Sequence, residues 1–268
     1  MDRYTGPSIN AWPSFADLML SVVLVLVIIL VAAVVFMNTG TDLSQVAASQ
    51  AAIRDTMEQA MEVEFEPGEG VGVYDMTICT EKPPDVLADS SSSCEKHQIE
   101  SLIQVTDEPL IQRITFRGQM FFETNKSNLT DHGESLVEKI GESIVSELPS
   151  VREVQIHGHA DLASDPEVYP RDESGISEEG RRQNLRLASD RALTVFDLLK
   201  KKGVDPVENL MSAASYGPYH PVNRRDDQTY SEKKLKAHNL TKDLQNQNRR
   251  IELRLYFSVP AAPRPGAS

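Results

Sequence analysis

The sequence is poor in cysteine, and its basic residues are outnumbered by its acidic residues. Its 268 residues include two cysteines, Cys79 and Cys94, and no Cys-x-x-Cys pair, which is too few for a metal cage of thiolates. Lysine and arginine number 27 against 40 acidic residues, so the net charge is −13. A chain of this charge with no basic stripe is a poor match for phosphates, and we expect no nucleic-acid partner.

Motifs for nucleophilic catalysis and nucleotide binding are also missing. The sequence has no Gly-x-Ser-x-Gly and no glycine-rich phosphate loop before a helix, and its "DSSSSC" run indicates a solvated loop. His157, His159 and Asp161 form an H-x-H-x-D pattern on one strand, where a zinc site could start, but no further ligand cluster is evident. We therefore expect no enzyme activity, no metal and no other cofactor.

One uninterrupted apolar run stands near the start of the chain. Residues 18–37 contain no charge, and Ser21 is their only polar residue. At about 1.5 Å per residue this run spans roughly 30 Å, the thickness of a bilayer core. It is long for a secretory signal, and no small-residue cleavage site follows. The sequence predicts a retained transmembrane helix over 12–37 after a cytoplasmic tail of residues 1–11, with the remainder across the membrane.

An aspartate stands at the mouth of this apolar run. Ser14 and Asp17 fit the S-x-x-D capping box, in which the hydroxyl caps the helix and the acid is favoured by the helix dipole. The same carboxylate could instead bind and release a proton, because acids at membrane depth are costly and usually functional. The two interpretations are compatible, and the segment alone leaves both open.

Residues 38–66 are rich in helix formers and predict a helical stalk. Six positions recur with spacings of three and four, the pattern of a short coiled coil, which predicts a homodimer seam. The alternative is an amphipathic helix that lies against the domain or the lipid surface. Residues 67–101 are rich in Gly, Pro and Ser and predict a loop-rich linker with one short strand, in which Cys79 and Cys94 could form a disulfide outside the cytoplasm. The seam positions are Leu43, Val46, Gln50, Ile53, Met57 and Ala60.

The remainder of the chain alternates between strand and helix patterns. "LIQRITF", "VREVQIHGHAD", "LMSAASYG" and "RRIELRLYF" are typical of strands, and "LTDHGESLVEKIGESIVSEL" carries a helical apolar stripe. A long helix follows in "EEGRRQNLRLASDRALTVFDLLKKKG", with Gly203 as its C-cap candidate. The pattern predicts an α+β domain over 102–258, with one sheet and helices packed on one face, before a disordered tail at 259–268.

Three motifs in this domain resemble those of a known family. "VQIHGHAD", "NLRLASDRALTVFDLLKKKGV" and "NRRIELRL" occur in the order found in the OmpA-like peptidoglycan-binding domain, and the resemblance covers about 110–257. It implies a βαβαββ sandwich. Together with one N-terminal apolar segment reading "FADLM", the chain resembles the B subunit of ion-driven stators, the MotB and ZorB group.

This second resemblance implies a bacterial inner-membrane protein with a single pass and a periplasmic C-terminal domain. It further implies that Asp17 is the ion-translocating residue and that a homodimer sits in a ring, typically a pentamer, of MotA/ZorA-like A subunits. On the apolar side of Asp17, Ser21 is the only nearby hydroxyl, which favours protons over sodium. The short, nearly uncharged N-terminus favours a ZorB-like role in anti-phage defence over a flagellar MotB. The alternative function is a passive membrane-anchored tether.

Peptidoglycan stems of the diaminopimelate type expose an amino group beside a carboxylate. A receptor for them needs a fixed anion and a fixed guanidinium a few ångströms apart. The resemblance assigns the ammonium to Asp161 and the carboxylate to Arg191, with Asn184 shaping the pocket and Asn125 as a weaker match. Arg250 matches an arginine that we expect to be a structural clamp. Two insertions, 164–181 and 223–247, depart from compact members of the family.

Overall fold

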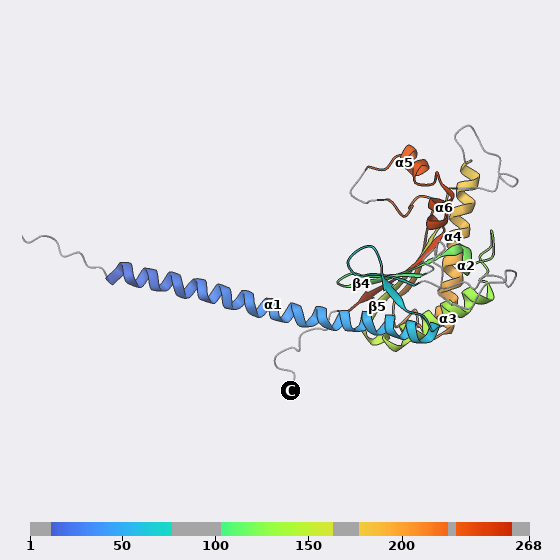
Figure 1. Ribbon diagram of the computed structural model, residues 1–268. Coiled ribbons are helices and arrows are strands. Elements are labelled where there is room, and N and C mark those ends of the chain that lie inside the picture. Colours follow the sequence, from blue (N-terminus) through green and yellow to red (C-terminus); the bar gives the residue numbers. More distant parts are fainter. Residues whose placement is uncertain (1–11, 77–102, 163–176, 225–228, 259–268) are drawn as a thin grey trace, which may run out of the picture. The chain divides into compact units, whose positions relative to one another are not determined.

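The computed structural model describes residues 12–76, 103–162, 177–224 and 229–258 (Figure 1). It separates into two compact units, Met1–Gln45 and Val46–Ser268, and each is described by itself. Cys79 and Cys94, with the disulfide predicted between them, lie outside the described residues.

The first unit contains the N-terminal part of helix α1 (Trp12–Met61). Its large apolar side chains between Met19 and Val31 are 47–71% exposed. The transmembrane prediction for 12–37 is not confirmed: within the described residues, no helix has a stretch long and apolar enough to cross a membrane. The side chain of Asp17 lies outside the described residues.

The second unit begins with the rest of α1, and here the coiled-coil interpretation needs correction. Val46, Ile53 and Met57 are buried in the core of the chain's own domain, and Ile53 is 0% exposed. Gln50, the polar residue of the predicted seam, donates to the main-chain oxygen of Glu108 at 2.8 Å. The helix therefore presents its apolar stripe to the domain, which is the alternative that the spacing left open.

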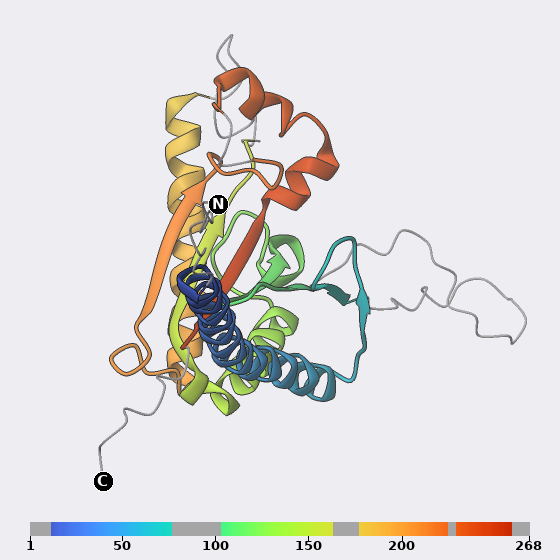
Figure 2. The same ribbon diagram turned by 90° about the vertical axis from the view of Figure 1, so that its left-hand side faces the viewer.

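Among the described residues, seven strands form one sheet in the order β1-β2-β3-β4-β7-β5-β6. Figures 1 and 2 show this sheet from two directions. Strands β5 and β6 are parallel, and every other neighbouring pair is antiparallel. The short strand predicted in the linker corresponds to β2, and a further strand, β1, lies at the end of the predicted helical stalk. The strands are β1 Phe65–Pro67, β2 Val73–Met76, β3 Ile103–Asp107, β4 Ile111–Arg117, β5 Val151–His159, β6 Met211–Gly217 and β7 Arg250–Phe257.

The helices of the second unit begin and end where local signals place them. Thr130 and Ser177 cap α3 and α4, since their hydroxyls accept from the amides of Gly133 and Gly180. Gly203 follows α4 with a φ of +109°, as expected of a C-cap glycine. The order β4-α3-β5-α4-β6-β7 matches the predicted βαβαββ pattern. The helices are α2 Gly118–Phe121, α3 Asp131–Ser146, the 3-10 turn Leu148–Ser150, α4 Glu178–Lys201, α5 Glu232–Ala237 and α6 Lys242–Asn248.

The two faces of the sheet differ in chemistry. Ile114, Ile156 and Leu253 point to the face that packs with helices α3 and α4 and are fully buried there. Residues one position away, such as His157 and Glu252, point to the other face, because successive strand side chains alternate. The α+β class, with a mixed sheet and helices, is confirmed.

The docked part of α1 makes a stability prediction. We expect Ile53→Ala to lower the free energy of unfolding by about 2–5 kcal/mol, because it leaves a cavity in the core. The exposed neighbour Gln59, changed to Ala, should alter it by less than about 0.5 kcal/mol. Urea unfolding of the full chain measures both. A dimer that falls apart in Ile53→Ala without loss of domain stability would restore the coiled-coil interpretation.

Candidate functional site

Strand β5 and helix α4 carry the three main residues of the predicted site. Asp161 follows the end of β5, and Asn184 and Arg191 lie on α4, seven positions and about two turns apart. The two elements touch through their backbones at Gly158, where a Cβ atom would overlap the carbonyl oxygen of Ala188. This approach places α4 directly over the strand end from which Asp161 projects.

Asp161 is buried and held by two of its neighbours. Its Oδ2 accepts a hydrogen bond from the guanidinium of Arg249 at 2.7 Å, which is also an ion pair. Its main-chain oxygen accepts from Nδ2 of Asn184 at 3.0 Å. Asn184 thus fixes the backbone of the acid, as a pocket-shaping residue does.

Arg191 is buried from the other side of the same site. Its Nε donates to the main-chain oxygen of Lys126 at 2.9 Å, and its guanidinium lies 5.1 Å from the ring centroid of Phe122. Burial, together with the neighbouring Arg249, lowers the pKa of Arg191 to about 10, and the carboxylate of Asp161 opposes this shift. The guanidinium therefore remains charged at neutral pH.

Asn125 lies in the loop beside Arg191 rather than in the buried site. It is exposed and has a φ of +58°, a conformation that asparagine tolerates better than most residues. The next residue, Lys126, supplies the carbonyl that holds Arg191. The loop geometry gives Asn125 a conformational role beside the site.

The second insertion packs against the chain immediately after Asp161. Oδ1 of Asn239 accepts from the amide of Leu162 at 3.0 Å and from Nδ2 of Asn248 at 2.8 Å. The side chain of Leu235, on α5, is buried against Leu162. The insertion therefore packs beside the site, and its Asn239, which accepts from Asn248, binds the segment that follows the acid.

Sequence reasoning missed Arg249, which belongs to the N-R-R-I-E motif. The sequence predicted a structural clamp at its neighbour Arg250. Arg250 is buried and its Nε donates to Glu252 at 2.8 Å, as a structural clamp would. The signal for Arg249 was available in the period-2 alternation of β7. Arg249 shares its phase with Ile251, on the sheet face that α4 covers, and so can reach Asp161.

The charges of the site favour a particular ligand. Arg249 forms an ion pair with Asp161, and both of them act on the pKa of Arg191, so the three groups together carry one excess positive charge. A ligand carboxylate would balance that excess, and a ligand ammonium would bind beside the acid. The arrangement is suited to a molecule that carries both groups close together.

The predicted H-x-H-x-D trio does not form one site. His157 and His159 lie on the polar face of the sheet, next to Glu252 of β7, whereas Asp161 lies beyond the strand end and pairs with Arg249. Burial lowers the pKa of His157 to about 4 and that of His159 well below its usual value.

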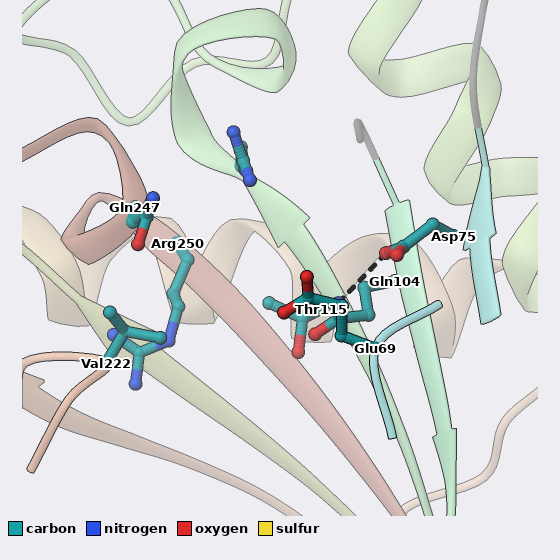
Figure 3. Close-up of a pocket in the computed structure, with 8 residues that line it drawn as sticks. Glu69, Asp75, Gln104, Thr115, Val222, Gln247 and Arg250 are labelled. Carbon is teal, nitrogen blue, oxygen red and sulfur yellow. Dashed lines mark hydrogen bonds between the residues drawn. The ribbon is translucent and has the colours of Figure 1, made fainter. Parts of the chain in front are cut away.

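A cavity of about 350 Å³ lies on the polar face, between β2, β3, β4 and the start of β7 (Figure 3). Figure 3 shows Asp75 and Gln104 on one side, joined by a hydrogen bond of 2.9 Å, with Arg250 and Gln247 on the other. Asp75 is thus bonded to Gln104, and Arg250 is bonded to Glu252. The charges that line the cavity therefore select no ligand. It is lined by Glu69, Asp75, Gln104, Thr115, Arg117, Val222, Gln247 and Arg250.

A family model places most of this site within a known domain. Residues 121–234 match the model of the OmpA family. These residues form an OmpA-family domain. The match contains Asp161, Asn184 and Arg191 and ends before Arg249. No curated protein matches the chain.

Solved structures with a similar fold include three from different bacteria. The periplasmic domain of Helicobacter pylori MotB is 20% identical, with a TM-score of 0.41 over 58% of this chain and 80% of that one. A cell wall anchor of the type VI secretion system from Pseudomonas aeruginosa is 20% identical, with a TM-score of 0.43 over 59% and 89%. The peptidoglycan-associated lipoprotein of Burkholderia pseudomallei is 21% identical, with a TM-score of 0.32 over 52% and 88%.

The contact between β5 and α4 makes a prediction for the OmpA-family domain. We expect Gly158→Ala to lower the free energy of unfolding by about 1–3 kcal/mol, because its methyl group would force α4 away from the strand. Gly141→Ala is the matched control, since its new Cβ would lie 3.2 Å from Cδ2 of Leu199 and 3.3 Å from Cβ of Lys202, against 2.0 Å from the carbonyl oxygen of Ala188 at Gly158. Thermal and urea unfolding compare the two. Equal stability of both variants would show that this approach does not constrain the site.

Proposed function

We propose that the OmpA-family domain binds peptidoglycan through the stem peptide. The observation that carries this proposal is the buried Asp161, which pairs with the guanidinium of Arg249 at 2.7 Å and acts on the pKa of the buried Arg191. Side chains of this kind, placed by strand and helix rather than by loops, give a rigid receptor for a zwitterionic group. Diaminopimelate in the stem carries such a group, with an ammonium and a carboxylate on the same carbon.

In the proposed complex, each charge of the ligand pairs with an opposite charge of the site. The ligand carboxylate bonds to the guanidinium of Arg191, whose orientation is set by the carbonyl of Lys126. The ligand ammonium bonds to the carboxylate of Asp161 alongside Arg249, and Asn184 holds the backbone of that residue. Because both ligand charges are matched in a largely dry site, a ligand that lacks either charge leaves a buried partner uncompensated.

Sedimentation with insoluble peptidoglycan tests the site. We expect Asp161→Ala and Arg191→Ala each to abolish co-sedimentation of the full chain, because each removes one of the two charges that recognise the stem. Asp190→Ala and Arg186→Ala are matched controls, since these side chains have the same charges, lie on α4 and are exposed. Circular dichroism checks that all four variants are folded.

A second arm tests the ligand chemistry. Peptidoglycan with lysine in place of diaminopimelate lacks the extra carboxylate, so the wild-type chain should bind it much more weakly. Equal binding to both polymers, or binding that survives both site variants, would refute recognition of the zwitterionic group.

The finer role that we propose is that of the B subunit of an ion-driven stator. Its support is the "FADLM" motif and the segment of α1 from Met19 to Val31, whose apolar side chains are exposed around the whole helix. A helix that is apolar all round needs an apolar environment. The helices of an A-subunit ring would supply it and would enclose Asp17, and the wall-binding domain would hold the B subunit still while the ring moves.

Replacement of Asp17 separates this role from a passive tether. We expect Asp17→Asn to abolish ion flux through the assembled A–B complex while leaving peptidoglycan binding intact, because the amide cannot take up and release a proton. Moving a charge through the membrane potential is worth about 2.3 kcal/mol per 100 mV, so its loss should stop the motor. Asp42→Asn, outside the apolar segment, is the matched control. Normal flux in Asp17→Asn would leave the tether as the function.

A further inference from the structure

Three side chains of the kinds that bind metal ions lie close together on the polar face of the sheet, away from the proposed wall site. His157 and His159 lie on β5, and Glu252, on β7, is the cross-strand partner of His157. One ligand atom from each lies within 4.8 Å of the other two. All three are buried: His157 is 4% exposed, His159 1% and Glu252 5%.

Hydrogen bonds fix the tautomer of His159. Its Nδ1 lies 3.2 Å from the main-chain oxygen of His220, and because a carbonyl only accepts, Nδ1 carries the hydrogen. Nε2 is then a bare acceptor. It faces Oε1 of Glu252 at 3.6 Å, and among the described residues it has no hydrogen-bond donor.

The same reasoning applies to His157. Its Nε2 lies 3.1 Å from Oε1 of Gln155, an oxygen that also accepts from the hydroxyl of Tyr256. The amide nitrogen of Gln155 donates to Glu153, which confirms the orientation of the amide. Nε2 of His157 therefore donates, and Nδ1 is bare, buried and without a partner in the described part of the chain.

Each ring thus has one buried nitrogen without a hydrogen-bond partner in the described part of the chain, and both rings lie beside the carboxylate of Glu252. Each unsatisfied buried acceptor costs on the order of 1–3 kcal/mol. A single proton could bridge only two of the three, whereas a divalent cation satisfies all of them at once. The outer hydrogen bonds of the two rings, to Gln155 and to the carbonyl of His220, are those that orient metal-binding histidines.

We propose that Nδ1 of His157, Nε2 of His159 and a carboxylate oxygen of Glu252 bind a divalent metal ion of the zinc class. Two imidazoles and one carboxylate are a ligand set that zinc accepts, with a fourth position left for water or another group. The ion would join β5 to β7 two residues before Asp161. It would therefore stabilise the strand end that carries Asp161. The metal-site proposal does not rest on the proposal that the domain binds peptidoglycan.

Two guanidiniums oppose the cation and set its affinity. Arg250 and Arg254 both bond to Glu252, at 2.7 Å and 2.8 Å. Their charges repel a divalent ion and compete for the carboxylate. Binding should accordingly be weaker than at closed structural zinc sites, and a chelator should remove the ion without unfolding the chain.

Metal titration of the full chain tests the proposal. The protein is purified without a histidine tag, carries Cys79→Ser and Cys94→Ser to remove thiolate binding, and is stripped with a chelator. Calorimetric titration with zinc alone should give one ion per chain and raise Tm. Cobalt alone should give the visible absorption of a tetrahedral site with nitrogen and oxygen ligands.

Variants locate the ion. His157→Gln and His159→Gln should each weaken zinc binding at least tenfold. His132→Gln, an exposed histidine on α3, is the matched control and should bind as the parent does. Unchanged binding in both site variants, or equal loss in the control, would overturn the assignment. If a site variant fails to fold, the parent chain still decides, because the absence of a stoichiometric ion and of a cobalt spectrum refutes the site.

Discussion

The proposed wall site depends on one backbone contact, the approach of Gly158 on β5 to the carbonyl of Ala188 on α4. No side chain larger than hydrogen fits between them, so strand and helix lie as close as two elements can. Asp161 projects from the end of that strand, and Asn184 and Arg191 from that helix, and their separation is therefore set by backbone rather than by flexible side chains. A receptor for two opposite charges needs this rigidity, because a misplacement of about 1 Å weakens both ion pairs together.

The charge arrangement explains why the site is stable without a ligand. A buried aspartate alone would carry a large desolvation cost, but Arg249 offsets it at 2.7 Å, and Asn184 anchors its backbone. Arg191 is in turn desolvated enough for its pKa to fall, yet the carbonyl of Lys126 and the ring of Phe122 hold it in place. Arg191, Arg249 and Asp161 together thus carry one excess positive charge.

Sequence patterns predicted most of the domain but left the partners of its charged residues open. The helical stripe of α3, the caps at Thr130 and Ser177, and Gly203 after α4 follow from local chemistry, and the structure has all of them. The spacing from Val46 to Met57 was misread, because a helix that docks on its own domain has the same three-four repeat as a coiled coil. Arg249 was missed because alternation predicts the face of a side chain but not the residue that it meets. For the same reason, the histidines of β5 were paired with Asp161 along the chain rather than with Glu252 across the sheet.

Strand β5 connects the proposed wall site with the histidine cluster, because its two faces have different roles. Its apolar positions, Val154 and Ile156, pack into the core with α4, and Gly158 allows the helix to approach. Its polar positions, His157 and His159, face away from that helix toward Glu252 and its two arginines. The strand end that carries Asp161 is therefore clamped from both sides, by backbone packing on one face and by a charged network on the other. Any group that tightens the polar face, a bound cation included, holds the acid in place without contact with the ligand.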